Sequence, residues 1–272
     1  MLIFSVLADI ATIVSALCGG DMTVEAIVAI IVLGILLLIF MIRDWYYSFL
    51  PYRVSSEWNV FGEINKAYST TRKDEIKDAK DASRLLNAYC DSISDIFTKI
   101  KGQRIGVCVK LLVKDEDGLP ILISQARDHD SKNDGRKTGS DDKTKHYLES
   151  NSDFFFIHEK GHSYFHSDDL ANEVNYTNTR LVEWSQPKKF PLIPQRLLRR
   201  HWWPLPYIST IVVPIWPLNC NFENKGKLRG FLCVDSSKTK TFNKSADVEM
   251  LRGMAEEITP IIDRLNELSR GK

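Results

Sequence analysis

Arg104 to Val113 reads RIGVCVKLLV and Leu119 to Ala126 reads LPILISQA, and these two stretches decide the fold class. Both are rich in the β-branched and apolar residues that favour extended backbone. The residues between them, 115–118, read DEDG, a composition typical of a tight turn. The sequence therefore predicts a β-hairpin here.

Two more strands are predicted towards the C-terminus, at Tyr207 to Trp216 (YISTIVVPIW) and Leu228 to Asp235 (LRGFLCVD). The polar stretch from Asp128 to Lys145 favours a mobile surface loop. Apolar residues at helical spacing then predict a closing helix over Ser245 to Ser269. We expect Pro260 to kink that helix.

A helical pattern also precedes the hairpin, between Glu57 and Gly102. Its apolar residues share one helical face. They are Leu85, Tyr89, Ile93, Ile96, Phe97 and Ile100. The sequence therefore predicts an α+β domain with helices at both ends of the strands.

This order of elements resembles a GAF domain, over roughly Ser83 to Leu268. The resemblance is carried by GFLCVDS at Gly230 to Ser236, by Phe242 and Asp247 after it, and by EKGHSYFHSDDL at Glu159 to Leu170. It implies a central antiparallel sheet flanked by helices and a ligand-sized cavity on one face. It also implies terminal helices that pair with a second copy.

The N-terminal region has the composition of a membrane segment. Val24 to Ile42 is apolar except for Glu25 and would span about 28 Å as a helix, roughly one hydrocarbon core. The shorter stretch 3–17 contains Asp9, and a GGD turn at 19–21 follows it. We favour a two-helix hairpin over a surface helix or a signal peptide.

The first basic residues after this region indicate on which side of the membrane the rest of the chain lies. Arg43 and Arg53 follow the apolar stretch, and basic residues are retained on the cytoplasmic side of a membrane. We therefore expect a bacterial inner-membrane protein with a cytoplasmic globular domain. The predicted organisation is a transmembrane hairpin or anchor over 1–50, a helical linker over 51–82 and the GAF-like domain over 83–272.

Composition and motifs exclude several function classes. With 36 basic and 35 acidic residues, the chain lacks the charge excess of a nucleic-acid-polymer binder. The five cysteines are scattered and form no CxxC pair. No phosphate-binding loop, Rossmann fingerprint or kinase signature is present, so we expect neither a cofactor nor an enzyme.

A basic and aromatic segment, Gln186 to Pro206, is the predicted ligand site. Four of its residues are candidates for contact with an anionic ligand, and Tyr164 and Asp168 join them from the middle of the GAF-like pattern. The four are Arg196, Arg199, Arg200 and Trp202. Contact with anionic lipid headgroups and simple packing of a proline-rich insertion remain alternatives.

A metal site is the other candidate, because His158 to His162 reads HEKGH and His166 lies four residues beyond. On a helix this spacing places two imidazoles on one face around zinc. Glu173 or Glu183 would supply a third ligand. Gly161 favours a turn instead, so a surface loop is the preferred interpretation.

The function predicted from the sequence is a membrane-anchored cytoplasmic sensor. Its GAF-like domain would bind a small ligand, such as a nucleotide, or a partner, and would control the transmembrane helices of a homo-oligomer in the lipid bilayer. Asp9 is the predicted output residue, because an acid within an apolar segment normally faces a helix interior or water. The layout resembles small membrane effectors of phage defence. A membrane adaptor and a membrane zinc hydrolase are the alternatives.

Overall fold

The computed structural model describes residues 12, 32–43, 76–142, 144–181, 199–217 and 227–270. The chain divides into two compact units, residues 1–62 and 63–272. In the first unit, residues 32–43 are helical and their large apolar side chains are exposed. Within these described ranges, no helix combines the length and the apolarity needed to cross a membrane. Asp9 and all of the predicted first span except residue 12 lie outside them.

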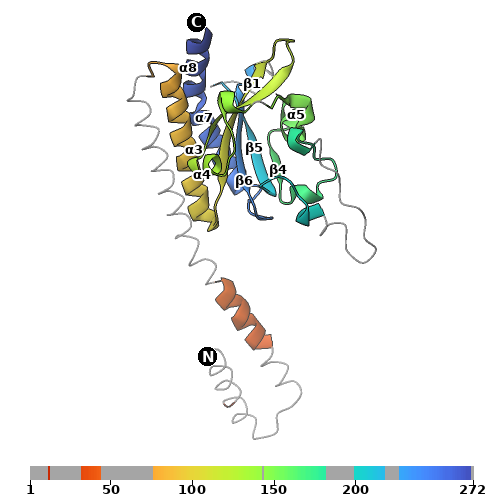
Figure 1. Ribbon diagram of the computed structural model, residues 1–272. Coiled ribbons are helices and arrows are strands. Elements are labelled where there is room, and N and C mark those ends of the chain that lie inside the picture. The colour runs from red at the N-terminus through yellow and green to blue at the C-terminus, as the bar shows by residue number, and fades with distance from the viewer. Residues whose placement is uncertain are drawn as a thin grey trace. The chain divides into compact units, whose positions relative to one another are not determined.

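The second unit is built on one six-stranded sheet with the order β3-β2-β1-β6-β5-β4, in which every neighbouring pair is antiparallel (Figure 1). The strands are β1 (Gly106–Lys114), β2 (Pro120–Arg127), β3 (His146–Tyr147), β4 (Phe165–Ser167), β5 (Ser209–Ile215) and β6 (Gly230–Ser236). The α-helices are α3 (Ala79–Lys101), α4 (His129–Asn133), α5 (Ser152–His158), α7 (Ala246–Glu257) and α8 (Thr259–Arg270).

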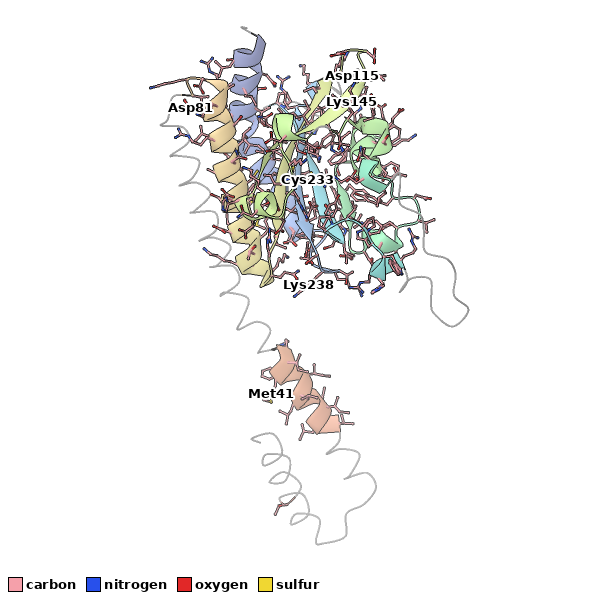
Figure 2. The ribbon with its side chains drawn as sticks, viewed as in Figure 1. Met41, Asp81, Asp115, Lys145, Cys233 and Lys238 are labelled. Atoms are coloured by element: carbon pink, nitrogen blue, oxygen red, sulfur yellow. The ribbon has the colours of Figure 1, made fainter. Side chains whose placement is uncertain are left out.

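The predicted hairpin and both late strands are confirmed. β1 and β2 pair directly, and the Asp115 side chain closes their turn by accepting hydrogen bonds from the backbone N–H groups of Asp117 (3.0 Å) and Leu119 (2.9 Å). Lys145 also reaches this turn, with its Nζ 3.9 Å from Asp115 Oδ2 (Figure 2). β6 lies between β1 and β5, so strands from the two ends of the domain form the centre of the sheet.

The long helix α3 has a capping residue at each end. The Asp78 side chain accepts a hydrogen bond from Asp81 N at 2.8 Å and caps the N-terminus. Gly102 ends the helix at φ +63°, a left-handed conformation that suits glycine. The buried face of α3 packs on β1 and β2, and Tyr89 donates its hydroxyl to Met254 O of α7 at 3.1 Å.

The closing helix differs from its prediction. Instead of one kinked helix, the chain forms α7 and α8 with a break at Ile258. Pro260 is the second residue of α8, where its missing N–H removes no intrahelical hydrogen bond. The expectation of a kinked single helix was therefore wrong, because proline is better accommodated by starting a helix than by bending one.

Different helices pack on the two faces of the sheet. Side chains alternate along a strand, so Val107 and Val109 face one side while Cys108 and Lys110 face the other. Helix α3 contacts β1 and β2 and α7 contacts β5 and β6, whereas α5 contacts β4 and β5. Figure 1 shows α3, α7 and α8 on the side of the sheet opposite to α5. On the α5 side, Phe154 packs on Phe231 with ring centroids 4.9 Å apart.

The predicted α+β class of the globular domain is confirmed by this topology. A central antiparallel sheet has helices at both ends of the domain, as the GAF resemblance implied. The predicted membrane hairpin and linker lie mostly outside the described residues. The sheet face that carries Cys108 and Lys110 contains the candidate site.

Candidate functional site

A polar cavity of about 50 Å³ lies between the sheet and the chain segments that connect β2 to β5. This volume holds several water molecules or a small ligand group. From the sheet, its lining includes Cys108, Lys110, Arg127, Thr210, Cys233 and Asp235. From the connecting segments, it includes Arg136, Asp142, His146, Asp153, Arg180 and Tyr207.

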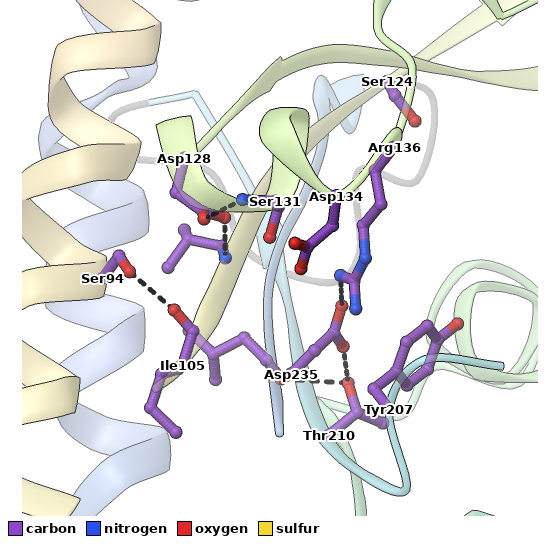
Figure 3. A network of polar contacts seen from close by, with 12 residues as sticks. Ser94, Ile105, Ser124, Asp128, Ser131, Asp134, Arg136, Tyr207, Thr210 and Asp235 are labelled. Carbon is purple, nitrogen blue, oxygen red and sulfur yellow. Dashed lines mark hydrogen bonds and ion pairs between the residues drawn. The ribbon is translucent and has the colours of Figure 1, made fainter. Parts of the chain in front are cut away.

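Asp128 follows the lining residue Arg127 directly after β2 and is buried. Its Oδ1 accepts a hydrogen bond from Val107 N at 2.6 Å and its Oδ2 accepts one from Ser131 N at 2.8 Å (Figure 3). The same carboxylate therefore caps α4 and ties it to β1. The predicted loop over Asp128 to Lys145 is thus wrong at its start, because this stretch begins with a buried anchor and a helical turn.

Gly106 makes room for the next cavity residue. A Cβ atom at this position would lie 2.9 Å from Ser131 Oγ and 3.2 Å from Arg136 Nη1. The absence of a side chain allows the Arg136 guanidinium to pass close to the β1 backbone. Arg136 thereby reaches the carboxylate of Asp235, which lies opposite Gly106 on β6.

Each carboxylate oxygen of Asp235 has a partner in the cavity lining. Its Oδ1 accepts a hydrogen bond from Thr210 Oγ1 at 2.8 Å, and its Oδ2 lies 3.3 Å from Arg136 Nη1 (Figure 3). The Arg136 guanidinium also lies over the Tyr207 ring, 5.3 Å from its centroid. Arg136 and Asp235 neutralise each other, so this pair adds no net charge to the cavity.

Asp142 and His146 form a second polar group. His146 Nε2 lies 3.1 Å from Asp142 Oδ2, and Arg180 Nη2 lies 3.9 Å from the same oxygen. Burial, together with the charge of Lys110, lowers the pKa of His146, so the imidazole is neutral at pH 7. Burial opposes ionisation of Asp142, but the interactions with His146, the Thr144 N–H and Arg180 together outweigh it, and the pKa of Asp142 is lowered.

Asp153 is a buried acid that forms no ion pair among the described residues. It is 3% exposed, its Oδ1 accepts a hydrogen bond from Phe154 N at 3.1 Å, and Tyr176 donates to its Oδ2 at 3.4 Å. Burial raises the pKa of Asp153 to about 7, and the neighbouring Lys110 only partly offsets this effect. About half of the Asp153 carboxyls therefore carry a proton at neutral pH.

Two cations of the lining have no carboxylate partner among the described residues. Arg127 is 7% exposed and its Nε is buried without a hydrogen-bond partner. Lys110 donates to the neutral Ser124 Oγ at 3.0 Å and lies over the Phe154 ring, with its Nζ 5.7 Å from the centroid. Buried charges are normally paired, because an unpaired charge in a low-dielectric interior is costly.

Cys108 and Cys233 are neighbours across β1 and β6 on the floor of the cavity. They are Cα partners in the antiparallel ladder, and both are buried free thiols. Burial raises the pKa of Cys233 well above its usual range, so its thiol stays protonated at neutral pH. The scattered cysteines of the sequence therefore include one pair that the sheet brings together.

The residues predicted to bind a ligand are not part of this lining. Arg200 donates to Thr239 Oγ1 at 3.2 Å, Trp202 is 60% exposed, and Arg199 is half-buried. Tyr164 lies under the Arg252 guanidinium, and Asp168 Oδ1 lies 3.6 Å from His166 Nε2. Arg196 lies outside the described residues. A ligand role for this group stays a prediction, at a place other than the cavity.

The predicted histidine motif does not form the helical arrangement that a zinc site of this spacing needs. Helix α5 ends at His158, and Gly161 adopts φ +72°, so His162 is on a different segment. The His158 ring bonds to Glu159, and the His162 ring stacks on Phe156. Glu173 bonds to Ser167, and Glu183 is outside the described ranges. Within those ranges, no cluster of three or more potential metal ligands occurs.

The cavity residues were missed because they are far apart in the sequence. A charged residue inside an apolar strand was the available signal, as in Lys110 within CVKLL and Asp235 at the end of GFLCVD. Each such residue can also point to solvent at a sheet edge. Only the strand order shows that Lys110 and Asp235 share one enclosed face.

Several solved structures are similar to this chain. The GAF domain of a phosphoenolpyruvate-protein phosphotransferase from Acinetobacter matches with 10% identity and a TM-score of 0.44, covering 76% of this chain and 95% of that chain. The corresponding domain from Coxiella burnetii matches with 11% identity and a TM-score of 0.44, covering 80% and 96%. A free methionine-R-sulfoxide reductase from Neisseria meningitidis, in complex with its substrate, matches with 14% identity and a TM-score of 0.43, covering 75% and 88%.

Comparison of the sequence with protein-family models found no match, and comparison with curated proteins found none either. The solved structures include both GAF domains and reductases. The function proposed below therefore rests on the chain's own cavity.

Proposed function

We propose that this protein is a sensor whose GAF-like domain binds a small molecule in the cavity between β1, β5, β6 and their cover. One observation carries the proposal: the cavity is lined by Arg127, a charged side chain that is almost fully buried, forms no ion pair among the described residues and keeps its Nε without a hydrogen-bond partner. Burial of a charge carries a desolvation cost, which the more distant Asp128 and Asp235 offset for Arg127, and a binding role explains why an open hydrogen-bond donor is kept there.

Filling the cavity tests this function. Val212 lies in the lining on β5 and is 1% exposed, so Val212→Phe places a ring in the available space. Small molecules extracted from the purified full chain, identified by mass spectrometry, should raise the melting temperature of the parent protein but not of this variant. The matched control is Val174→Phe, at a side chain that is 82% exposed, and it should respond like the parent.

Two results would contradict the cavity as the ligand site. An unchanged response in Val212→Phe would move the ligand to another place, such as the segment that contains Arg199, Arg200 and Trp202. If no extracted molecule stabilised the parent, a membrane adaptor that tethers a partner would explain the chain better.

We also propose that the N-terminal region anchors the sensor in the bacterial inner membrane and serves as its output. Support comes from the apolar stretch Val24 to Ile42 and from the exposed apolar side chains of the described helix 32–43. Several copies, gathered by their GAF-like domains, would place Asp9 within the membrane as part of an effector of the kind used in phage defence. The domain would then be cytoplasmic.

Cells that express the full chain test this part of the proposal. We expect the protein to stay in the membrane fraction after alkaline carbonate washing, and its activated form to depolarise the membrane. Asp9→Ala should remain in that fraction but no longer depolarise cells, because the polar group needed for ion passage is gone. Release of the parent protein by carbonate would rule out the anchor, and depolarisation by Asp9→Ala would rule out Asp9 as the output.

A further inference from the structure

The cavity has more cations than carboxylates available to balance them. Its basic residues are Lys110, Arg127, Arg136 and Arg180, and its acidic residues are Asp142, Asp153 and Asp235. Arg136 is paired with Asp235, and Arg180 lies nearest to Asp142. Apart from these two pairs, the lining contains two cations, Lys110 and Arg127, and one acid, Asp153.

Asp153 balances neither remaining cation well. The described residues contain no ion pair between Asp153 and a basic side chain, and its close contacts are the Phe154 N–H and the Tyr176 hydroxyl. Burial raises its pKa to about 7, so its charge is only partly present at neutral pH. The lining of the ligand-free cavity therefore holds more cationic side chains than ionised carboxylates.

A partly enclosed space with an excess of cationic side chains selects for the charge of its occupant. A cationic ligand would add to the unbalanced charge, and an uncharged ligand would leave Arg127 unpaired. An oxyanion supplies the counter-charge, and its oxygens accept hydrogen bonds from the remaining N–H groups of Arg127 and Lys110. The protonated form of Asp153 can donate one more hydrogen bond.

We propose that the cavity binds a small oxyanion, a carboxylate or a phosphate group, as the counter-charge of Arg127 and Lys110. The inference rests on the proposed function, because it names the chemical class of the ligand of the same cavity. The cavity volume of about 50 Å³ limits the enclosed part to one such group, so any larger portion of the ligand extends outside.

Matched probes test the charge of the ligand. The full chain, in neutral detergent at constant ionic strength, is titrated calorimetrically with acetate, inorganic phosphate and acetamide. Acetamide has the size and shape of acetate but no charge. We expect acetate or phosphate to bind and acetamide not to bind, and the stronger of the two anions distinguishes a carboxylate ligand from a phosphate ligand.

Matched variants test the site. Arg127→Met should weaken binding of the preferred anion at least about 30-fold, the effect typical of removing one partner of a buried charge pair. Its melting temperature without ligand, measured alongside, checks that the variant is folded. Arg84→Met is the control, since the Arg84 side chain is 71% exposed on α3, and its affinity should be unchanged.

If Arg127→Met fails to fold, Lys110→Met on β1 replaces it, and its affinity for the preferred anion should be weakened in the same way. The inference is overturned if acetamide binds as well as acetate, if neither anion binds, or if anion affinity survives both variants. None of these results removes the proposed sensor function, which the response of Val212→Phe to extracted molecules decides separately. If Val212→Phe no longer responds to the extracted molecules and acetate and acetamide bind equally, the protein would still be a sensor, but for a ligand of another class.

Discussion

Gly230→Ala is expected to abolish folding of the domain or to lower its free energy of unfolding by more than about 4 kcal/mol, among the largest effects of a single substitution. Gly230 begins β6, and a Cβ atom at this position would lie 2.0 Å from the carbonyl oxygen of Lys110 and 2.9 Å from Leu111 Cα. Both are backbone atoms of β1, so neither can move aside as a side chain would. The substitution must separate the two central strands of the sheet.

The measurement is urea denaturation followed by circular dichroism, with soluble expression as a first readout. Gly253→Ala is the matched control, because Gly253 lies in α7 and an added Cβ there would meet no atom within 4 Å. It should stabilise the domain by up to about 1 kcal/mol, since alanine favours a helix more than glycine does. A folded Gly230→Ala variant with the stability of the parent would show that β1 and β6 do not approach each other as described.

Asp153→Asn is expected to stabilise the ligand-free domain increasingly as the pH rises from 4 to 8. The folded-state pKa of Asp153, about 7, lies above its usual value of 3.8. Between these two values the folded protein binds more protons at this site than the unfolded chain does, so the contribution of Asp153 to stability falls as pH rises. Above pH 7 that contribution is constant.

The size of the change follows from the shift of about three pKa units. At about 1.4 kcal/mol per unit, ionised Asp153 costs on the order of 4 kcal/mol at pH 8 and almost nothing at pH 4. Asparagine does not titrate, so the difference in unfolding free energy between variant and parent should grow by that order across the range. Urea denaturation at several pH values measures it, with Asp95→Asn on the exposed surface of α3 as the control. Parallel pH profiles for Asp153→Asn and the parent would mean that Asp153 is not the buried acid described.

Local patterns were sufficient to predict most of the sheet. The β1–β2 hairpin has a clear turn between two apolar runs, and β5 and β6 are continuous apolar stretches, so their signals depend only on neighbours in the sequence. The short strand β3 was not predicted, because it has two residues and its pairing with Ile121 and Leu122 is what defines it. The break before Pro260 was also missed, since a kink and a new helix have the same local signal.

The predicted ligand residues do not line the cavity, for a related reason. Clusters such as LLRRHWWPLP and HEKGH attract notice because their residues are adjacent in the sequence, yet adjacency alone does not enclose a ligand. The cavity instead combines Arg127 from the end of β2, Asp153 from α5 and Asp235 from β6. No spacing rule connects these three positions.

The α+β class, the central hairpin, the two late strands and the helices at both ends were predictable from residue order, because periodicity and turn composition are properties of short segments. The location of the site depends on how distant segments pack together. Placing β6 between β1 and β5 puts Lys110, Cys108, Cys233 and Asp235 on one face, and the segments after β2 enclose that face with Arg136 and Asp153. Burial and charge balance in this enclosed space exist only after distant strands pair, so the cavity, the unpaired charge of Arg127 and the raised pKa of Asp153 were not available from the order of residues.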